Sequence, residues 1–539
     1  MKLGLVLGLL TAVGTAAQAA PEIVRPRLLG AVVDWPGAFA ALGKVDGLRA
    51  DNKESDSSLL ARINKASEPY LPNVEASPIP VLLPVDVAAV LRDHGKASEP
   101  GEPPNAEPYF NGFHGPRFFL AGPAGFDSTF SIQTNDIKEL SDIPVHDPVD
   151  IHFSGFAFYY DLDDPAIEAR GVPALDAKYP GIRRFIHEGF VRYAFVHYGV
   201  PYVLAIDCFD GRPRILRLLC PQADRIAIHF LDRLQIAGGA PQPPPTMDPP
   251  VVVRPHTKDT AFSYYGPGRL LAGSSFRDSG GRVDYTVFAP IRFPLAEAPA
   301  YANSQLYREN QTKPYRGSPK PSDYTYPWRD NFCERRGFTV GQCPGGVGHQ
   351  GQDIRASPCP QPLGNGRCDP AHDIVAVRTG AIMRSPKQEA VYIVINNANE
   401  HLRFRYLHME PRKMDEDNLL SGRDVKEGEV IGKVSNYSQK ENGTSYHLHF
   451  DIQVPTKNGW VFVSPYMTLV VAYERLIGGR GVELFDVPHA AQAKDLNAID
   501  RPESAFPAST AKPQSRSDGA REPTSDQAGV KELLENRRD

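Results

Sequence analysis

The chain has 539 residues, an apolar fraction of 41% and a formal net charge of -5, with an isoelectric point near 6.3. This mildly acidic balance offers no basic field for nucleic acid, so a nucleic-acid-binding protein is not expected. The length allows two or three domains, each with its own core.

The first residues are typical of a secretory signal. Met1-Lys2 is followed by an apolar run from Leu3 to Val13 and by Ala16-Ala17-Gln18-Ala19, a small-x-small cleavage site. This pattern predicts a signal peptide at 1–19, with a buried N-terminal helix as the alternative. The apolar run is too short to span a bilayer and no later stretch qualifies, so we predict no transmembrane segment.

The next part of the chain changes character near residue 110. Residues 21–110 contain many prolines and polar stretches, which favour loosely ordered structure with a few strands. Residues 110–236 are aromatic and β-branched, and their alternation predicts strands at 151–160 and 191–206. We therefore expect a β-rich N-terminal domain of unknown role at 20–237. The Pro-rich stretch at 238–256 predicts an extended linker.

The six cysteines form three pairs that are close in the sequence: Cys208/Cys220, Cys333/Cys343 and Cys359/Cys368. In an exported protein such pairs are expected to be disulfides. A structural zinc is the weaker alternative, and other connectivities stay open. The first pair is expected to close a hairpin.

Two stretches in the third quarter of the chain carry potential metal ligands. In His349-Gln-Gly351-Gln-Asp353, an extended backbone would place the imidazole and the carboxylate on one face, because side chains alternate along a strand. The glycine between them removes a side chain that would block an approaching ion.

The second stretch, His447-Leu448-His449, begins an alternating apolar segment. It is predicted to be a strand whose two imidazoles share a face while Leu448 points into the core. Two nitrogens and a carboxylate oxygen with one position left open are what a catalytic zinc needs. His408, between the two stretches, adds a further imidazole.

These stretches resemble the M23 (lysostaphin/LytM-like) metallopeptidases, whose pattern is His-x-Gly-x-Asp, then Tyr-x-His, then Gly-x-Ser/Thr-x-x-His-Leu-His-Phe. The matching segments here are 349–353, Tyr406-Leu407-His408 and 443–450. The resemblance implies that zinc is held by His349, Asp353 and His449. It also implies that His408 and His447 are the catalytic general base and the donor to the developing oxyanion, without saying which does which. Asp451 either hydrogen-bonds a ligand imidazole or is solvated.

The fold class expected from the patterns and the resemblance is mostly β: a LytM-like β-sheet peptidase domain at 257–480, after the separate N-terminal domain and before a disordered tail at 481–539. Strands are expected at 283–293, 374–378, 391–395, 402–408 and 430–434, and a closing helix at 467–477. The stretch 425–432 resembles the family's hairpin. The stretch 326–333 is expected to be either a wall of the substrate groove or a disulfide-pinned structural loop.

The family cleaves peptide bonds of peptidoglycan, and a signal peptide with disulfides fits a periplasmic enzyme of a Gram-negative cell. The resemblance thus implies a secreted, periplasmic zinc metalloendopeptidase that hydrolyses the D-Ala–diaminopimelate cross-links of peptidoglycan. Glycine-bridge cleavage has no separate support. The alternative is a non-catalytic LytM-like regulator that binds and activates a cell-wall amidase, although such proteins lack parts of the His/Asp set that is complete here. A wall-binding module with a structural zinc is a third reading.

Overall fold

The computed structural model describes residues 23–485 except for 46, 50–52, 95–108, 146–147, 163–168, 209–217, 244–247, 249, 257–259, 309–318 and 358–371. The predicted signal peptide, the Cys359/Cys368 pair and nearly all of the predicted tail lie outside the described residues. The described part is mostly β, as predicted, and the domain boundaries stay predictions.

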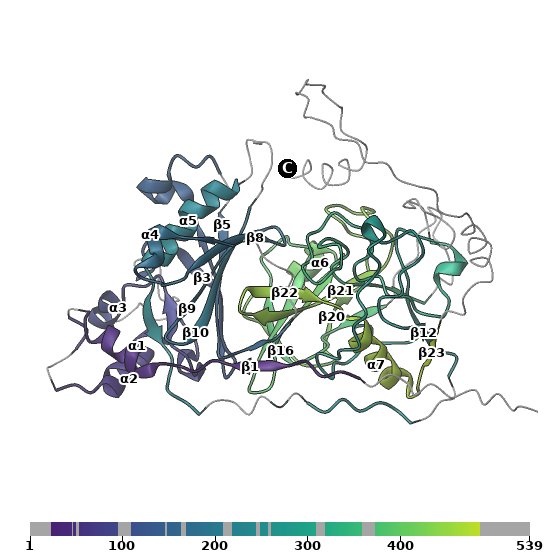
Figure 1. Ribbon diagram of the computed structural model, residues 1–539, viewed down its shortest axis with the longest axis horizontal. Coiled ribbons are helices and arrows are strands. Elements are labelled where there is room, and N and C mark those ends of the chain that lie inside the picture. Colours follow the sequence, from purple (N-terminus) through teal and green to yellow (C-terminus); the bar gives the residue numbers. More distant parts are fainter. Residues whose placement is uncertain are drawn as a thin grey trace, which may run out of the picture.

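A seven-stranded sheet forms the centre of the N-terminal half (Figure 1). In spatial order its strands are β3 (His114–Gly122), β4 (Gly125–Ile132), β5 (Val149–Phe156), β10 (Val200–Asp207), β9 (Phe190–His197), β8 (Arg183–His187) and β7 (Arg170–Gly171). Two small sheets pair β1 (Leu28–Gly30) with β6 (Phe158–Tyr160) and β2 (Val81–Leu83) with β11 (Gln235–Gly238).

Five helices accompany this sheet: α1 (Trp35–Leu42), α2 (Asp56–Ser67), α3 (Val87–Asp93), α4 (Pro173–Asp176) and α5 (Cys220–Asp232). The first three correct the prediction of loosely ordered structure before residue 110. Each begins at a side-chain cap, from Asp34, Ser55 and Asp86 respectively, which satisfies a backbone N–H of the first turn. Their apolar residues then join the N-terminal core.

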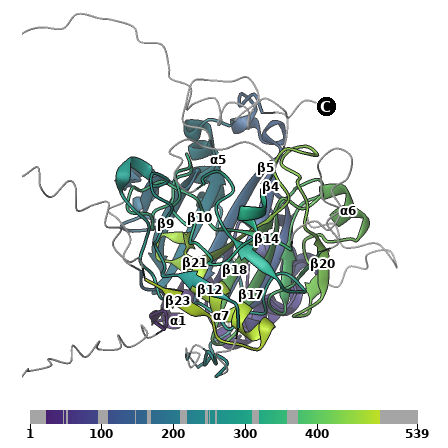
Figure 2. The same cartoon turned by 90° about the vertical axis from the view of Figure 1, so that its right-hand side faces the viewer.

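The C-terminal half contains an eight-stranded sheet, seen in front in Figure 2. Its strands run β13 (Ala300–Ala302), β14 (Gln352–Ala356), β21 (Leu448–Thr456), β18 (His401–Leu407), β17 (Val391–Asn396), β16 (Gly380–Met383) and β19 (Asp424–Val425), and β22 (Gly459–Val463) also pairs with β21. Smaller pairs are β15 (Asp373–Val375) with β20 (Val430–Lys433) and β12 (Ser263–Tyr265) with β23 (Val482–Leu484). The helices are α6 (Pro411–Glu416) and α7 (Tyr466–Ile477), the expected closing helix.

Three local predictions were wrong. Residues 283–293 form no strand beyond one bridge at Thr286, and Pro290 in this stretch has no N–H for a ladder. The stretch 425–432 is no paired hairpin, because β19 pairs with β16 and β20 with β15. The Cys208–Cys220 disulfide exists, but it joins the end of β10 to the start of α5 instead of closing a hairpin.

The two halves pack against each other through a buried polar cluster. Asp127 of β4 accepts hydrogen bonds from His401 and Arg403 of β18, each at 2.7 Å, and from the indole of Trp460 at 3.2 Å. Arg403 also lies 3.9 Å from the centroid of the Trp460 ring. Burial alone would raise the pKa of Asp127, but Arg403 and His401 outweigh it and hold that pKa below its ordinary range. This ion pair ties the N-terminal sheet to the strand that leads to the predicted site.

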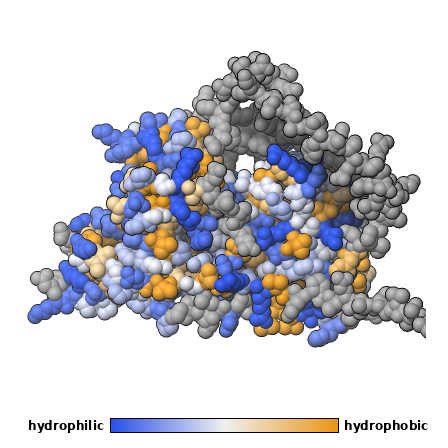
Figure 3. Space-filling view, in the orientation of Figure 1, coloured by the Kyte–Doolittle hydropathy of each residue, from blue (hydrophilic) through white to orange (hydrophobic). Residues whose placement is uncertain are grey.

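In the residues that the structure describes, no helix combines the length and the apolar character needed to cross a bilayer. On the face shown in Figure 3, hydrophobic residues lie in small groups among hydrophilic ones. Such scattered groups are ordinary for a protein surface.

Candidate metal centre

Three neighbouring strands at the centre of the C-terminal sheet position the predicted site residues. Asp353 on β14 lies directly opposite His449 on β21, and His449 lies opposite Leu407 on β18. His408 follows Leu407 with a φ of 68°, a left-handed conformation that ends the strand. The predicted strand at 349–353 begins later than expected, because His349 precedes β14.

One oxygen atom, Oδ1 of Asp353, lies at the centre of the site. It is 3.0 Å from Nδ1 of His449, 3.3 Å from Nε2 of His349 and 3.6 Å from Nε2 of His447. The His408 ring lies 4.7 Å from that of His447 by their centroids. The structure therefore brings all five predicted site residues together.

Backbone carbonyls orient three of the imidazoles. Nδ1 of His349 donates to the Asn331 carbonyl at 2.9 Å, that of His447 to Ser445 at 2.7 Å, and that of His408 to Tyr437 at 2.9 Å. Because a carbonyl only accepts, each neutral ring carries its proton on Nδ1 and keeps its lone pair on Nε2. For His349 and His447, that lone pair faces Asp353.

Burial decides the protonation of the two histidines that are not predicted ligands. It lowers the pKa of His408 well below its ordinary value, assisted by its imidazole neighbours, and it lowers the pKa of His447 to about 4. Burial alone would raise the pKa of Asp353, but the surrounding imidazoles hold it well below its usual range. For His449, burial would lower the pKa, yet hydrogen bonds to carboxylates raise it. His408 and His447 are thus neutral near pH 7 and able to accept a proton.

Gly351 has a structural role in addition to the predicted one of leaving room for an ion, which stays a prediction. A Cβ there would lie 2.4 Å from the Phe450 carbonyl oxygen and 3.0 Å from Nε2 of His449. The glycine therefore permits the close approach of the loop before β14 to β21.

A buried ion pair supports His449 from behind. Nε2 of His449 lies 3.2 Å from Oδ2 of Asp451, which also accepts a 2.6 Å hydrogen bond from Arg405. Arg405 in turn donates to the side chain of Gln350 at 2.9 Å. Asp451 is fully buried, so of the two alternatives for this residue the hydrogen bond is found and solvation is not. Such a partner fixes the orientation of an imidazole and raises its basicity.

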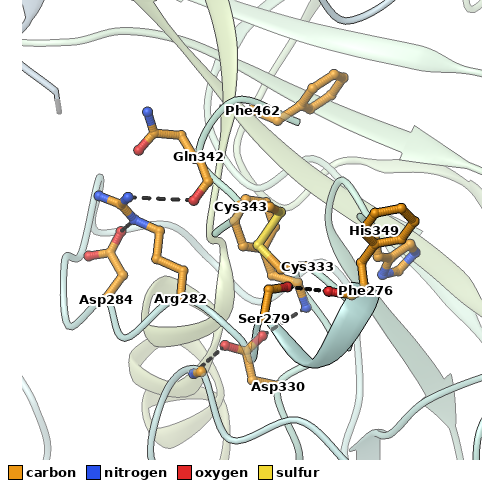
Figure 4. Close-up of a disulfide and its surroundings, with 12 residues drawn as sticks. Phe276, Ser279, Arg282, Asp284, Asp330, Cys333, Gln342, Cys343, His349 and Phe462 are labelled. Carbon is orange, nitrogen blue, oxygen red and sulfur yellow. Dashed lines mark hydrogen bonds and ion pairs between the residues drawn. A yellow bond between two sulfur atoms is a disulfide. The ribbon is translucent and has the colours of Figure 1, made fainter. Parts of the chain in front are cut away.

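A disulfide-pinned loop supports His349 (Figure 4). Cys333, bonded to Cys343, donates its N–H to the His349 carbonyl at 3.0 Å, and the His349 N–H donates to the Glu334 carbonyl at 2.8 Å. Asn331, two residues earlier, accepts from the His349 ring through its carbonyl and from the Asp353 N–H through its side chain at 3.1 Å. One loop therefore fixes two of the predicted ligands.

The same loop decides between the alternatives for residues 326–333. Trp328 is fully buried and donates its indole N–H to the Ala300 carbonyl at 2.8 Å. The stretch is thus a structural support rather than a groove wall at this residue. Sequence reasoning missed Asn331 and Arg405. Alternation on β18 and β21 would have placed Arg405 opposite Asp451, whereas no pattern links Asn331 to a histidine 18 residues later.

The donor set suits zinc. His349, Asp353 and His449 each offer one ligand atom, all within 4.8 Å of one another, and all three side chains are buried. Two imidazole nitrogens and one carboxylate oxygen match the ligand number of a catalytic zinc, which keeps a further position for substrate or water. Within the described ranges, no second group of this kind occurs.

The chain was compared with protein families, solved structures and curated proteins. The family model described as Peptidase family M23 matches residues 348–461. Among solved structures, lysostaphin from Staphylococcus simulans is 21% identical with a TM-score of 0.16, over 26% of this chain and 50% of that one. Helicobacter pylori Csd3 in an orthorhombic crystal is 11% identical with a TM-score of 0.18, over 68% and 79%. The chain thus spans about half of the lysostaphin chain, and no curated protein matches.

The matched segment contains all five predicted site residues, from His349 to His449. It also contains the strands β14, β18 and β21 that bring them together. The resemblance predicted from the motifs is confirmed: residues 348–461 match the model of peptidase family M23.

Proposed function

We propose that this protein is a zinc metalloendopeptidase that hydrolyses peptide cross-links of peptidoglycan, with the D-Ala–diaminopimelate bond as its substrate. The observation that carries the proposal is the convergence of three imidazole nitrogens on one Asp353 oxygen within an M23 segment. The two described disulfides and the predicted signal peptide support export to the periplasm.

In this proposal, zinc is held by His349, Asp353 and His449. When bound, it supplies Lewis-acid chemistry toward a carbonyl and a nearby water. Asn331 and Asp451 hold the ligand side chains in place through the hydrogen bonds described above. This support removes the cost of reorganising the site when substrate binds.

His408 and His447 carry the protons. In each ring Nε2 is unprotonated and keeps its lone pair, because the proton is on Nδ1 and is donated to a carbonyl. Such a nitrogen accepts the proton released as water attacks the peptide carbonyl. The resulting imidazolium then donates it to the leaving amine, so the protons balance. The second imidazole lies beside the first. Because its Nδ1–H is engaged with a carbonyl, it would donate to the developing oxyanion through Nε2 only after taking up a second proton from solvent.

A second candidate function is a LytM-like regulator that binds and activates a cell-wall amidase. The observation in its favour is burial: His349, Asp353 and His449 are 4%, 2% and 4% exposed. A peptidase must bring a polymer to a metal held by these buried side chains, which demands access to the site. A regulator has no need of such access.

The test is digestion of purified cross-linked peptidoglycan by the full-length mature chain. We expect muropeptide dimers to disappear with wild type, to persist with chelator or with His449→Ala, and to disappear again when zinc is restored to the chelated wild type. Persistence of dimers with folded, zinc-loaded wild type, together with faster stem-peptide release by an added amidase, would support the regulator and overturn the enzyme.

A further inference from the structure

Arg355 is a buried cation on the metal side of β14. It lies two residues after Asp353 on the same strand, so the two side chains project from the same face of the sheet. Its exposed fraction is 2%, the same as that of Asp353. A guanidinium in such a place normally has a carboxylate beside it, because burying an unpaired charge is costly.

Among the residues that the structure describes, no carboxylate forms an ion pair with Arg355, and Asp323 and Asp353 attract it only from a greater distance. Its NH1 atom makes two long contacts, 3.5 Å to the Ser445 hydroxyl and 3.4 Å to the Tyr446 carbonyl, and its Nε is buried without a hydrogen bond. The Tyr324 ring lies 5.9 Å away, and the side chain of Tyr324 hydrogen-bonds the guanidinium.

Other buried arginines of the chain differ from it in this respect. Arg192 lies 2.9 Å from Glu188, Arg384 lies 2.7 Å from Asp415, and Arg403 lies 2.7 Å from Asp127. Arg355 thus has donors for an anion and no carboxylate within ion-pair distance to receive them.

The position of Arg355 indicates which anion it would bind. Its two long contacts are to Ser445 and Tyr446, which directly precede His447, and the Ser445 carbonyl is the acceptor for the His447 ring. An anion on Arg355 would therefore lie beside an imidazole of the proposed catalytic pair and beside the strand of Asp353. The charge of Arg355 acts on both His447 and Asp353, so a group bound to Arg355 would lie close to a bond held at the metal centre.

We propose that Arg355 is a specificity-determining residue that binds a substrate carboxylate next to the scissile peptide bond. The inference rests on the proposed function and deepens it. In a D-Ala–diaminopimelate cross-link, the diaminopimelate carbon that bears the linked nitrogen also bears a free carboxylate, whereas a glycine bridge has none. A guanidinium matches a carboxylate with two parallel hydrogen bonds.

The test compares two cross-linked muropeptide dimers, one with this carboxylate free and one with it amidated. We expect full-length, zinc-loaded wild type to cleave the free form with a kcat/KM about 10–100-fold higher, the usual worth of a hydrogen bond to a charged group. Arg355→Gln should bring the ratio near one by slowing only the free form, and Arg355→Lys should keep part of the preference. Arg225→Gln, at an exposed arginine of the N-terminal half, serves as the control and should keep the wild-type ratio.

Zinc content and the thermal midpoint are measured for every variant, so that loss of folding is recognised. Wild type that cleaves both dimers equally well overturns the inference without any variant, and so does an Arg355→Gln that keeps the wild-type ratio. Wild type that cleaves neither dimer, although loaded with zinc, overturns the proposed function itself and the inference with it.

Discussion

Removing the Cys333–Cys343 disulfide should weaken zinc binding far more than removing Cys208–Cys220. The first bond pins the loop whose backbone pairs with His349, while the second joins β10 to α5 in the N-terminal half. The perturbation is a double Cys→Ser substitution at either pair, so each variant loses one cross-link and gains two hydroxyls.

The two bonds are a matched pair for stability. Their sequence separations are 10 and 12 residues, and the entropy of closing loops of this size corresponds to about 3 kcal/mol in each case. Both variants should therefore lose similar stability. The zinc site responds differently, because the loop of Cys333 also carries Asn331, the partner of His349 and Asp353. Loss of such support costs about 10–100-fold in metal affinity, which is about 1.4–2.8 kcal/mol.

The assay is competition for zinc between the full-length protein and a fluorescent chelator, with the thermal midpoint measured on the same samples. We expect Cys333→Ser/Cys343→Ser to bind zinc about tenfold or more weakly and Cys208→Ser/Cys220→Ser to bind it like wild type. Equal zinc affinities in the two variants would refute the role of the loop in holding the ligands.

Three further outcomes are expected. Asp451→Ala should weaken zinc binding about tenfold in the same competition assay, because the His449 ring loses its hydrogen-bond partner. An unchanged zinc affinity would show that this hydrogen bond does not support metal binding. Asp127→Asn should destabilise the chain by about 3 kcal/mol at pH 7, because it leaves Arg403 buried without a counter-charge. Since the folded pKa of Asp127 is lowered, its stabilisation is present above about pH 4 and is lost as the pH falls through the lowered pKa; urea midpoints that differ from wild type by the same amount at pH 7 and at pH 2 would contradict this. Gly351→Ala should lower both zinc affinity and thermal midpoint, because its Cβ would meet the backbone of β21, whereas Gly171→Ala, with open space around it, should change neither; equal behaviour of the two variants would speak against close approach at Gly351.

The site could be predicted from the sequence because its residues lie in short motifs, within which neighbours along the chain determine the geometry. Alternation along a strand, together with motif spacing, determines which residues share a face, so the relation of Asp353 to Arg355 and of His447 to His449 follows from the chain itself. Pairing of β14 with β21 then brings the two motifs together. The motifs did not include the residues that support the ligands, namely Asn331 from the disulfide-pinned loop and Arg405 from the neighbouring strand β18.

The parts that the sequence did not predict depend on contacts distant along the chain. Asp127 meets Arg403 across 276 positions, and a buried charge gives no sign in the sequence of where its partner lies. The early helices were missed for a different reason. Proline content outweighed the signals that were present, such as Ser55 as a cap before the amphipathic α2, in which Leu59 and Ile63 are buried.

The proposed reaction is hydrolysis of the peptide cross-link at the site of His349, Asp353 and His449. It can be followed by mass spectrometry of a purified D-Ala–diaminopimelate muropeptide dimer after incubation with the zinc-loaded full-length protein in water enriched in oxygen-18. We expect two monomers, with one heavy oxygen in the new D-Ala carboxyl group and none in the diaminopimelate half, and no such product from His449→Ala. An intact dimer, or a label at any other bond, would contradict it.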